Sequence, residues 1–125
     1  ALALGGHPVP VPPGARGLYH LAASLGANGL TGLVAASRDA LVAAGFEPGE
    51  ALGALGPLLR AALEEALRLG PETALTGPAA RGDEATIERH RRAILSWDAE
   101  RAGLLEALLR EQRLLARRRR DGAGW

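Results

Sequence analysis

Apolar residues recur at intervals of three and four along most of the chain, which is the period of an α-helix rather than of a strand. Glycine, proline or polar breaks separate four such stretches. We expect four long helices, over residues 15–44, 48–70, 83–95 and 97–119. Gly45 suits the C-terminal cap of the first helix and Pro48 the first turn of the second, while Pro57 is expected to kink the second. The pattern therefore predicts an all-α fold, a helical bundle of four to five main helices with a long first helix.

The chain opens with a segment that does not follow the helical period. Prolines alternate with valines over residues 8–13, which forces extended backbone and removes N–H donors. Such a segment commonly enters one domain from another. We expect residues 1–14 to be an interdomain linker, residues 15–120 to form one helical domain, and residues 121–125 to be a tail.

Composition narrows the chemistry that the chain can perform. Of 125 residues, 47% are hydrophobic with only 3% aromatic, so the core must be built from small and aliphatic side chains. The chain has no cysteine, which excludes disulfides and thiolate metal sites and is compatible with a cytoplasmic location. All fifteen basic residues are arginine, a bias typical of a GC-rich, thermophilic source. We expect a cytoplasmic protein without lysine chemistry.

Charge gives little reason to expect a nucleic-acid or membrane partner. The net charge is +1, and the one charge block is Arg117 to Arg120. This block suits either a phosphate-binding arm or a solvated helix end whose cations complement the helix dipole, and the absence of interleaved aromatic residues favours the second. Residues 17–37 carry no formal charge, yet they include His20, Asn28 and four glycines. We therefore interpret them as a buried helix rather than a membrane span.

The link between the second and third helices is unusually rich in residues that fix the backbone conformation. Residues 75–83 read Leu-Thr-Gly-Pro-Ala-Ala-Arg-Gly-Asp, with two glycines and one proline, and Asp83 suits a helix N-cap. Thr76 and Arg81 flank Gly77, so the turn can offer a hydroxyl, backbone amides and a guanidinium to a carboxylate or phosphate. The alternative is that Arg81 pairs with a nearby acid such as Asp83. We expect this turn to face a cleft.

Two features mark the first helix. His20, Ser24 and Asn28 are spaced four apart and lie on one face, where they either line a ligand or satisfy one another in a helix contact. A second face carries Gly26, Gly29 and Gly32, each of which costs helix propensity. That cost indicates a close approach to the backbone, and with the leucine stripe of the last helix it predicts a helix-on-helix dimer.

No catalytic or nucleotide-binding motif is present in this sequence. It contains no Gly-x-Ser-x-Gly elbow, no phosphate loop and no Gly-x-Gly-x-x-Gly pattern. Three dispersed histidines, His7, His20 and His90, give no metal-ligand spacing.

Several short motifs nevertheless resemble one family. They are Leu4-Gly5-Gly6 with Pro8-Val9, Tyr19-His20 with Ala22-Ala23 and Asn28, Leu58-Leu59-Arg60, Leu75-Thr76-Gly77-Pro78 with Ala80-Arg81-Gly82-Asp83, and His90. Together they resemble the C-terminal helical domain, catalogued as of unknown function, of bacterial Rossmann-like NAD(P)-binding proteins. That domain is similar to the C-terminal domains of 6-phosphogluconate dehydrogenase, ketopantoate reductase and pyrroline-5-carboxylate reductase. The similarity covers most of residues 4–95.

The resemblance implies a substrate-binding and dimerisation domain of an NAD(P)-dependent oxidoreductase. NADP or NAD would be held by an N-terminal domain that this chain lacks, so this chain alone would bind no cofactor and be inactive. A homodimer and a small acid substrate are expected, with Ser24, Asn28, Thr76, Gly77 and Arg81 as substrate contacts. Several relatives carry a lysine where this chain has Ser24, which leaves His20 as the candidate proton donor.

Two alternatives to this function remain. The first is a structural or regulatory dimerisation module that catalyses nothing. The second, less favoured, is a helical domain that binds nucleic acid through Arg117 to Arg120.

Overall fold

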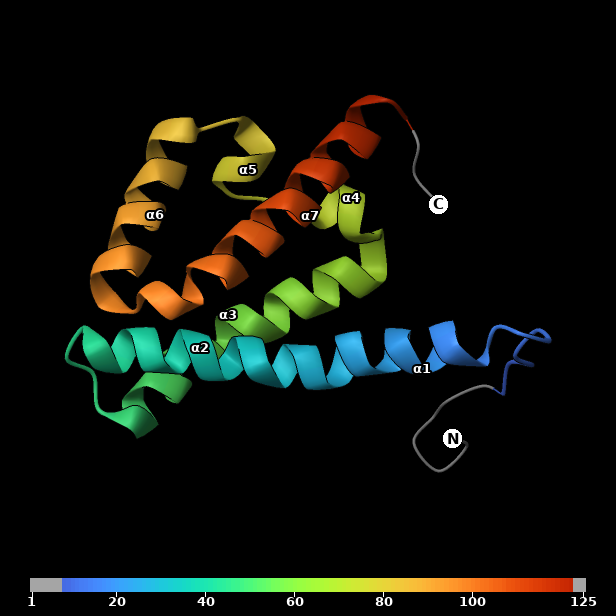
Figure 1. Ribbon diagram of the computed structural model, residues 1–125, viewed down its shortest axis with the longest axis horizontal. Coiled ribbons are helices and arrows are strands. Elements are labelled where there is room, and N and C mark those ends of the chain that lie inside the picture. Colours follow the sequence, from blue (N-terminus) through green and yellow to red (C-terminus); the bar gives the residue numbers. More distant parts are fainter. Residues whose placement is uncertain (1–7, 123–125) are drawn as a thin grey trace. The chain divides into compact units, whose positions relative to one another are not determined.

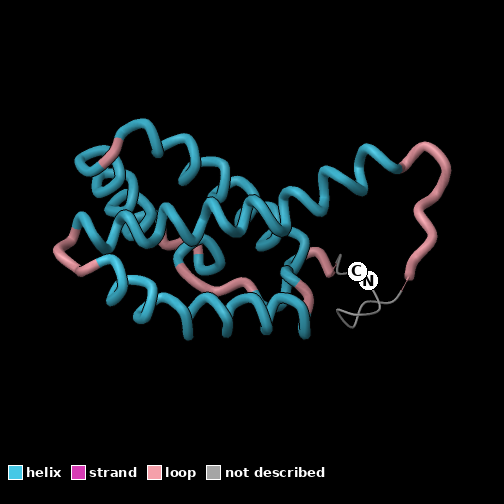
Figure 2. The backbone as a smooth tube through the Cα atoms, turned by 90° about the horizontal axis from the view of Figure 1, so that it is seen from below, coloured by secondary structure: helices cyan, strands magenta, loops and turns pink. Residues whose placement is uncertain are grey.

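The computed structural model describes residues 8–122, and every regular element in that range is helical (Figure 2). The elements are α1 (Arg16–Ser24), the π-helical turn η2 (Leu25–Gly29), α2 (Leu30–Ala43), α3 (Pro48–Leu69), α4 (Pro71–Ala74), α5 (Pro78–Arg81), α6 (Glu84–Trp97), the 3-10 turn η3 (Ala99–Arg101) and α7 (Ala102–Arg120). The predicted all-α class is confirmed. Part of the expected linker, residues 1–7 with His7, and part of the expected tail, residues 123–125, lie outside the described range.

The chain divides into two compact units, residues 1–39 and residues 40–125. The boundary falls within α2. The domain limits expected from the sequence, at residues 14 and 120, stay predictions.

The first unit contains α1, η2 and the beginning of α2. The residues that join them, Leu25 and Leu30, both keep right-handed helical dihedrals, so the backbone stays helical through the π turn. The single long helix predicted over residues 15–44 is therefore confirmed, with a local widening at Leu25–Gly29. Two of the five residues of that turn are glycine. Because glycine is conformationally permissive, the backbone can adopt the π-helical geometry there at a lower energetic cost. The burial expected for residues 17–37 is wrong, because residues 17–32 are exposed and residues 33–37 are only half-buried.

The second unit packs α4, α5 and α6 against the last helix, α7 (Figure 1). Its buried core is small: Ile87 of α6 is fully buried and packs with Ala79 and Leu109, with Leu105 partly buried beside them. A bidentate ion pair joins α6 to α7, since Arg91 Nε donates to Glu106 Oε1 at 2.7 Å and Arg91 Nη2 donates to Glu106 Oε2 at 3.2 Å.

Helix α3 begins where the sequence predicts, with Pro48 in its first turn. Its N-terminus is closed by a capping box, in which the backbone N–H of Glu47 donates to Glu50 Oε2 at 3.4 Å. The last residue of the helix is Leu69, and Gly70 follows as its cap. The φ of Gly70 is 84°, which glycine adopts readily and other residues adopt only at an energetic cost.

The predicted boundary of the last helix is wrong. The sequence predicted a last helix over residues 97–119, but residue 97 still belongs to α6, and the Ser96 hydroxyl donates back to the Ala93 carbonyl at 3.1 Å within that helix. The break comes at Asp98, whose backbone is extended and whose carboxylate accepts the Glu100 N–H at 3.2 Å. Asp98 thus caps the 3-10 turn η3 and separates it from α6. Helix α6 therefore includes Trp97, and α7 begins only at Ala102.

Candidate functional site

The polar stripe predicted on the first helix lies on α1 and η2. Ser24 and Asn28 contact each other, with Asn28 Nδ2 donating to Ser24 Oγ at 3.4 Å. His20 lies against Tyr19, with ring centroids 5.5 Å apart and the rings 66° from parallel. All three polar residues of the stripe are exposed, and no residue among 8–39 hydrogen-bonds the His20 imidazole. The stripe therefore presents a histidine whose two ring nitrogens remain available.

Asn28 belongs to the π turn, which the helical period alone did not predict. The signal available in the sequence was the pair Gly26 and Gly29, interpreted there as a packing face. Single π turns inside α-helices are frequent at functional sites because the extra residue re-aims the side chains that follow.

The turn over residues 75–83 is built by two glycines around the short helix α5. Gly77 has φ 86° and ψ −173°, and Gly82 has φ 68° and ψ 28°. Asp83 caps α6 as predicted: its carboxylate accepts the Thr86 backbone N–H at 3.0 Å and the Thr86 hydroxyl at 2.7 Å. These two hydrogen bonds lower the pKa of Asp83 below its usual value. With its carboxylate engaged by Thr86, Asp83 forms no ion pair with Arg81.

Thr76 and Arg81 line different cavities. Thr76 lines a cavity of about 470 Å³ between α3, α4 and α7, together with apolar residues such as Leu58 and Leu115. Arg81 lines a second cavity, of about 480 Å³, beside α7. The Leu75 carbonyl between them accepts a hydrogen bond from Arg119 Nη1 at 3.0 Å. Thr76 and Arg81 thus share no cavity, and their role as substrate contacts stays a prediction.

The second cavity brings together arginines whose proximity the sequence did not predict. Arg113, Arg117 and Arg120 of α7 line it with Arg81 of α5. The spacing of three and four residues along α7 was the signal that they share a face. We call the cavity lined by these four residues the arginine cleft.

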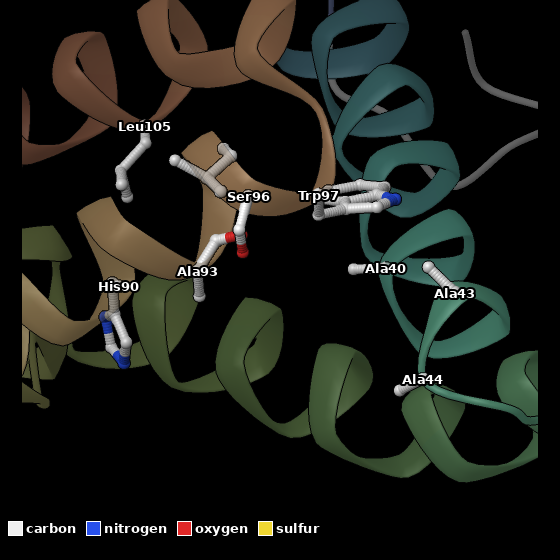
Figure 3. Close-up of a pocket in the computed structure, with 9 residues that line it drawn as sticks. Ala40, Ala43, Ala44, His90, Ala93, Ser96, Trp97 and Leu105 are labelled. Atoms are coloured by element: carbon white, nitrogen blue, oxygen red, sulfur yellow. The ribbon is translucent and has the colours of Figure 1, made fainter.

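A third cavity, of about 680 Å³, is mostly apolar (Figure 3). It lies between the end of α2, the second half of α6 and Leu105 of α7. Figure 3 shows Trp97 beside Ala40, and His90 among the lining residues. The residues that line it include no arginine and no acidic side chain. This cavity offers hydrophobic contact and few polar anchors.

Residues 8–122 contain neither a cluster of metal-ligating side chains nor a strand. In that range no group of three histidine or acidic side chains could hold a metal ion. It also has no strand, so the strand and glycine-rich turn that bind dinucleotides in Rossmann folds are missing from it. None of its helices combines the length and the apolar character needed to cross a membrane.

Comparison with known proteins identifies a family. No curated protein and no solved structure matches the chain significantly. A family model matches residues 1–111, which include α1 to α6 and half of α7. The chain therefore belongs to the family described as "Domain of unknown function (DUF2520)".

Proposed function

We propose that this chain is the substrate-binding and dimerisation domain of an NAD(P)-dependent oxidoreductase. Membership in a family of unknown function carries no activity, so the reaction class rests on the resemblance of the first helix and of the turn at residues 75–83 to domains of reductases. The observation that carries the proposal is the exposed stripe of His20, Ser24 and Asn28. Because these polar side chains are exposed and not buried inside their own unit, a substrate can reach them.

His20 is the proposed proton donor. Imidazole exchanges protons readily near neutral pH, and no residue of its own unit hydrogen-bonds the His20 ring. Ser24 and Asn28 follow it on the same face, and their own hydrogen bond of 3.4 Å is long enough to be exchanged for a ligand. Thr76, Gly77 and Arg81 are the proposed substrate contacts on the second unit. A guanidinium is well matched to the carboxylate of a small acid.

The dinucleotide would be bound elsewhere in the protein. This assignment is supported by the lack of a strand among residues 8–122 and of a dinucleotide fingerprint in the sequence, both of which a Rossmann-type site needs. When bound by its own domain, the cofactor would supply the hydride; the residues described here would position the substrate and provide the proton.

A homodimer accounts for the apolar surface of the first helix. Leu18, Leu21 and Leu25 are 71%, 51% and 66% exposed. A side chain added at Gly26 or Gly32 would meet no atom of residues 8–39 within 4 Å. The glycines are thus not required by packing inside their own unit, and we propose that a helix of a second copy approaches them.

The experiment compares His20→Ala with His90→Ala in the complete protein. Each variant loses one imidazole, so the two substitutions are chemically the same. His90 lies on α6, outside the proposed substrate stripe. General acid catalysis contributes about 10²–10⁴-fold, so His20→Ala should lower kcat by about that factor, and His90→Ala should leave it near that of the wild type. Equal kcat values for His20→Ala and the wild type would refute the assignment. Binding of the cofactor with no substrate turned over would favour a structural or regulatory dimer.

A further inference from the structure

The four arginines at the C-terminal end of α7 do not form one uniform basic surface. Arg118 Nη1 lies 3.6 Å from Glu72 Oε1, and the Glu72 side chain is buried. Arg119 Nη1 donates to the Leu75 carbonyl at 3.0 Å. Two of the four are thus tied to α4 and to the residue that follows it. Arg117 and Arg120 turn instead to the arginine cleft.

The arginine cleft lies between α5, the first turn of α6 and one face of α7. Figure 1 shows α5 near the C-terminal half of α7, and the two helices are in contact. The small buried side chains Ala79 and Ala116 line its inner part, while the four arginines surround it. Small residues at the base leave the volume of about 480 Å³ open.

The cleft carries an excess of positive charge. Its one acidic lining residue, Glu84, is already engaged, because Arg113 Nη2 donates to both of its carboxylate oxygens at 2.8 Å. In the range 8–122 no carboxylate forms an ion pair with Arg81, Arg117 or Arg120. The nearby carboxylate of Asp83 is held by Thr86. Three guanidinium groups therefore line one cavity without a carboxylate in ion-pair contact, although the charge of Asp83 interacts with that of Arg81.

The helix dipole does not explain this arrangement. Cations in the last turn of a helix are stabilised by its C-terminal dipole, and this accounts for Arg117 and Arg120. It accounts little for Arg81, which ends the four-residue α5, and not for Arg113, which lies two turns before the end of α7. Like charges gathered from two helices repel one another, and an anion in the cleft would remove that repulsion.

We propose that the arginine cleft binds a small anion with two or more negative charges, a phosphate ester or a polycarboxylate. Guanidinium groups present paired N–H donors that match the oxygen atoms of both. The inference shares Arg81 with the proposed function but goes beyond it, since binding here needs neither a dinucleotide nor turnover. A nucleic acid fits less well, because Arg118 and Arg119 are engaged elsewhere and the remaining arginines gather around one cavity rather than follow a track along the surface.

The test is isothermal titration of the complete protein with pyrophosphate and, separately, with citrate, at low ionic strength. The double variant Arg117→Gln/Arg120→Gln removes two unpaired charges from the cleft. The control, Arg68→Gln/Arg92→Gln, removes the same net charge from exposed positions on α3 and α6. A second variant, Arg81→Gln, changes the α5 side of the cleft alone.

We expect at least one of the two anions to bind the wild type, and the tighter one identifies the ligand class. Charge-assisted hydrogen bonds are strong enough that the cleft double variant should bind about tenfold or more weakly, with the control within about twofold of the wild type. Arg81→Gln should weaken binding in the same direction. Far-UV circular dichroism checks that each variant remains helical.

Three results would overturn the proposal. The first is that neither anion binds the wild type at millimolar concentration. The second is that the control loses as much affinity as the cleft variants, which would indicate a diffuse charge effect. The third is that single-stranded DNA binds more tightly than either small anion and loses that affinity in the cleft variants. None of these measurements uses a dinucleotide, so a failure of the proposed oxidoreductase activity would leave the result unaffected.

Discussion

Replacing Gly77 with alanine tests the construction of the turn at residues 75–83. With φ 86° and ψ −173°, Gly77 occupies a backbone region that is essentially restricted to glycine. A Cβ added at Gly77 would meet no atom within 4 Å, so the cost comes from the backbone and not from a clash. Such strain costs on the order of 1–3 kcal/mol, and we expect Gly77→Ala to lower the free energy of unfolding by about that amount.

Gly53→Ala is the matched control for this prediction. Gly53 lies inside α3, and a Cβ added there also meets no atom within 4 Å. Its substitution should raise the free energy of unfolding by roughly 0.5–1 kcal/mol, because alanine is the better helix former. Urea unfolding followed by far-UV circular dichroism measures both changes. If Gly77→Ala matched or exceeded the wild type in stability, the described turn would be wrong.

Three further predictions concern the core, the ion pair and the dimer. Ile87→Ala should lower the free energy of unfolding in urea by about 2–5 kcal/mol, since Ile87 is fully buried. Leu95→Ala on the same helix should lower it by less than about 1 kcal/mol, since Leu95 is 58% exposed, and equal losses would contradict the described core. The hydrogen bonds from Arg91 lower the pKa of Glu106, so this carboxylate stabilises the fold above its unfolded-state pKa and ceases to do so as the pH falls through its folded-state pKa. Glu106→Gln should therefore lower the thermal midpoint by a few degrees at neutral pH and make progressively less difference as the pH falls through the folded-state pKa of Glu106, and a difference independent of pH would exclude this explanation. Gly32→Ala should weaken the proposed dimer in light scattering of the complete protein, and a more stable variant with an unchanged dimer would show that no partner helix packs there.

Local sequence signals predicted the helices well and their ends unevenly. Pro48, Gly45 and Asp83 act within a few residues of their own positions, and each lies where the sequence placed it. Ser96 and Asp98 compete for the same boundary, and the sequence does not show which of them will bond back into its own helix. The π turn at Leu25–Gly29 was likewise missed, because a glycine-rich helix and a π turn share the same apolar period.

The candidate site was only partly accessible to sequence reasoning. The stripe on α1 follows from spacing alone, because residues four apart share a helix face. The arginine cleft does not, since Arg81 and Arg117 are 36 residues apart and meet only through the packing of α5 against α7. Nor does spacing reveal that Arg118 is drawn to the buried Glu72, which separates it from its neighbours in the sequence.

The most direct measurement of the proposed function is oxidation of NADH and NADPH by the complete protein against a panel of small keto and imino acids. The proposal predicts that at least one acid is reduced and that His20→Ala reduces it more slowly by about two orders of magnitude or more. Dinucleotide binding with no oxidation across the panel would contradict the proposal and favour a dimerisation domain without a reaction of its own.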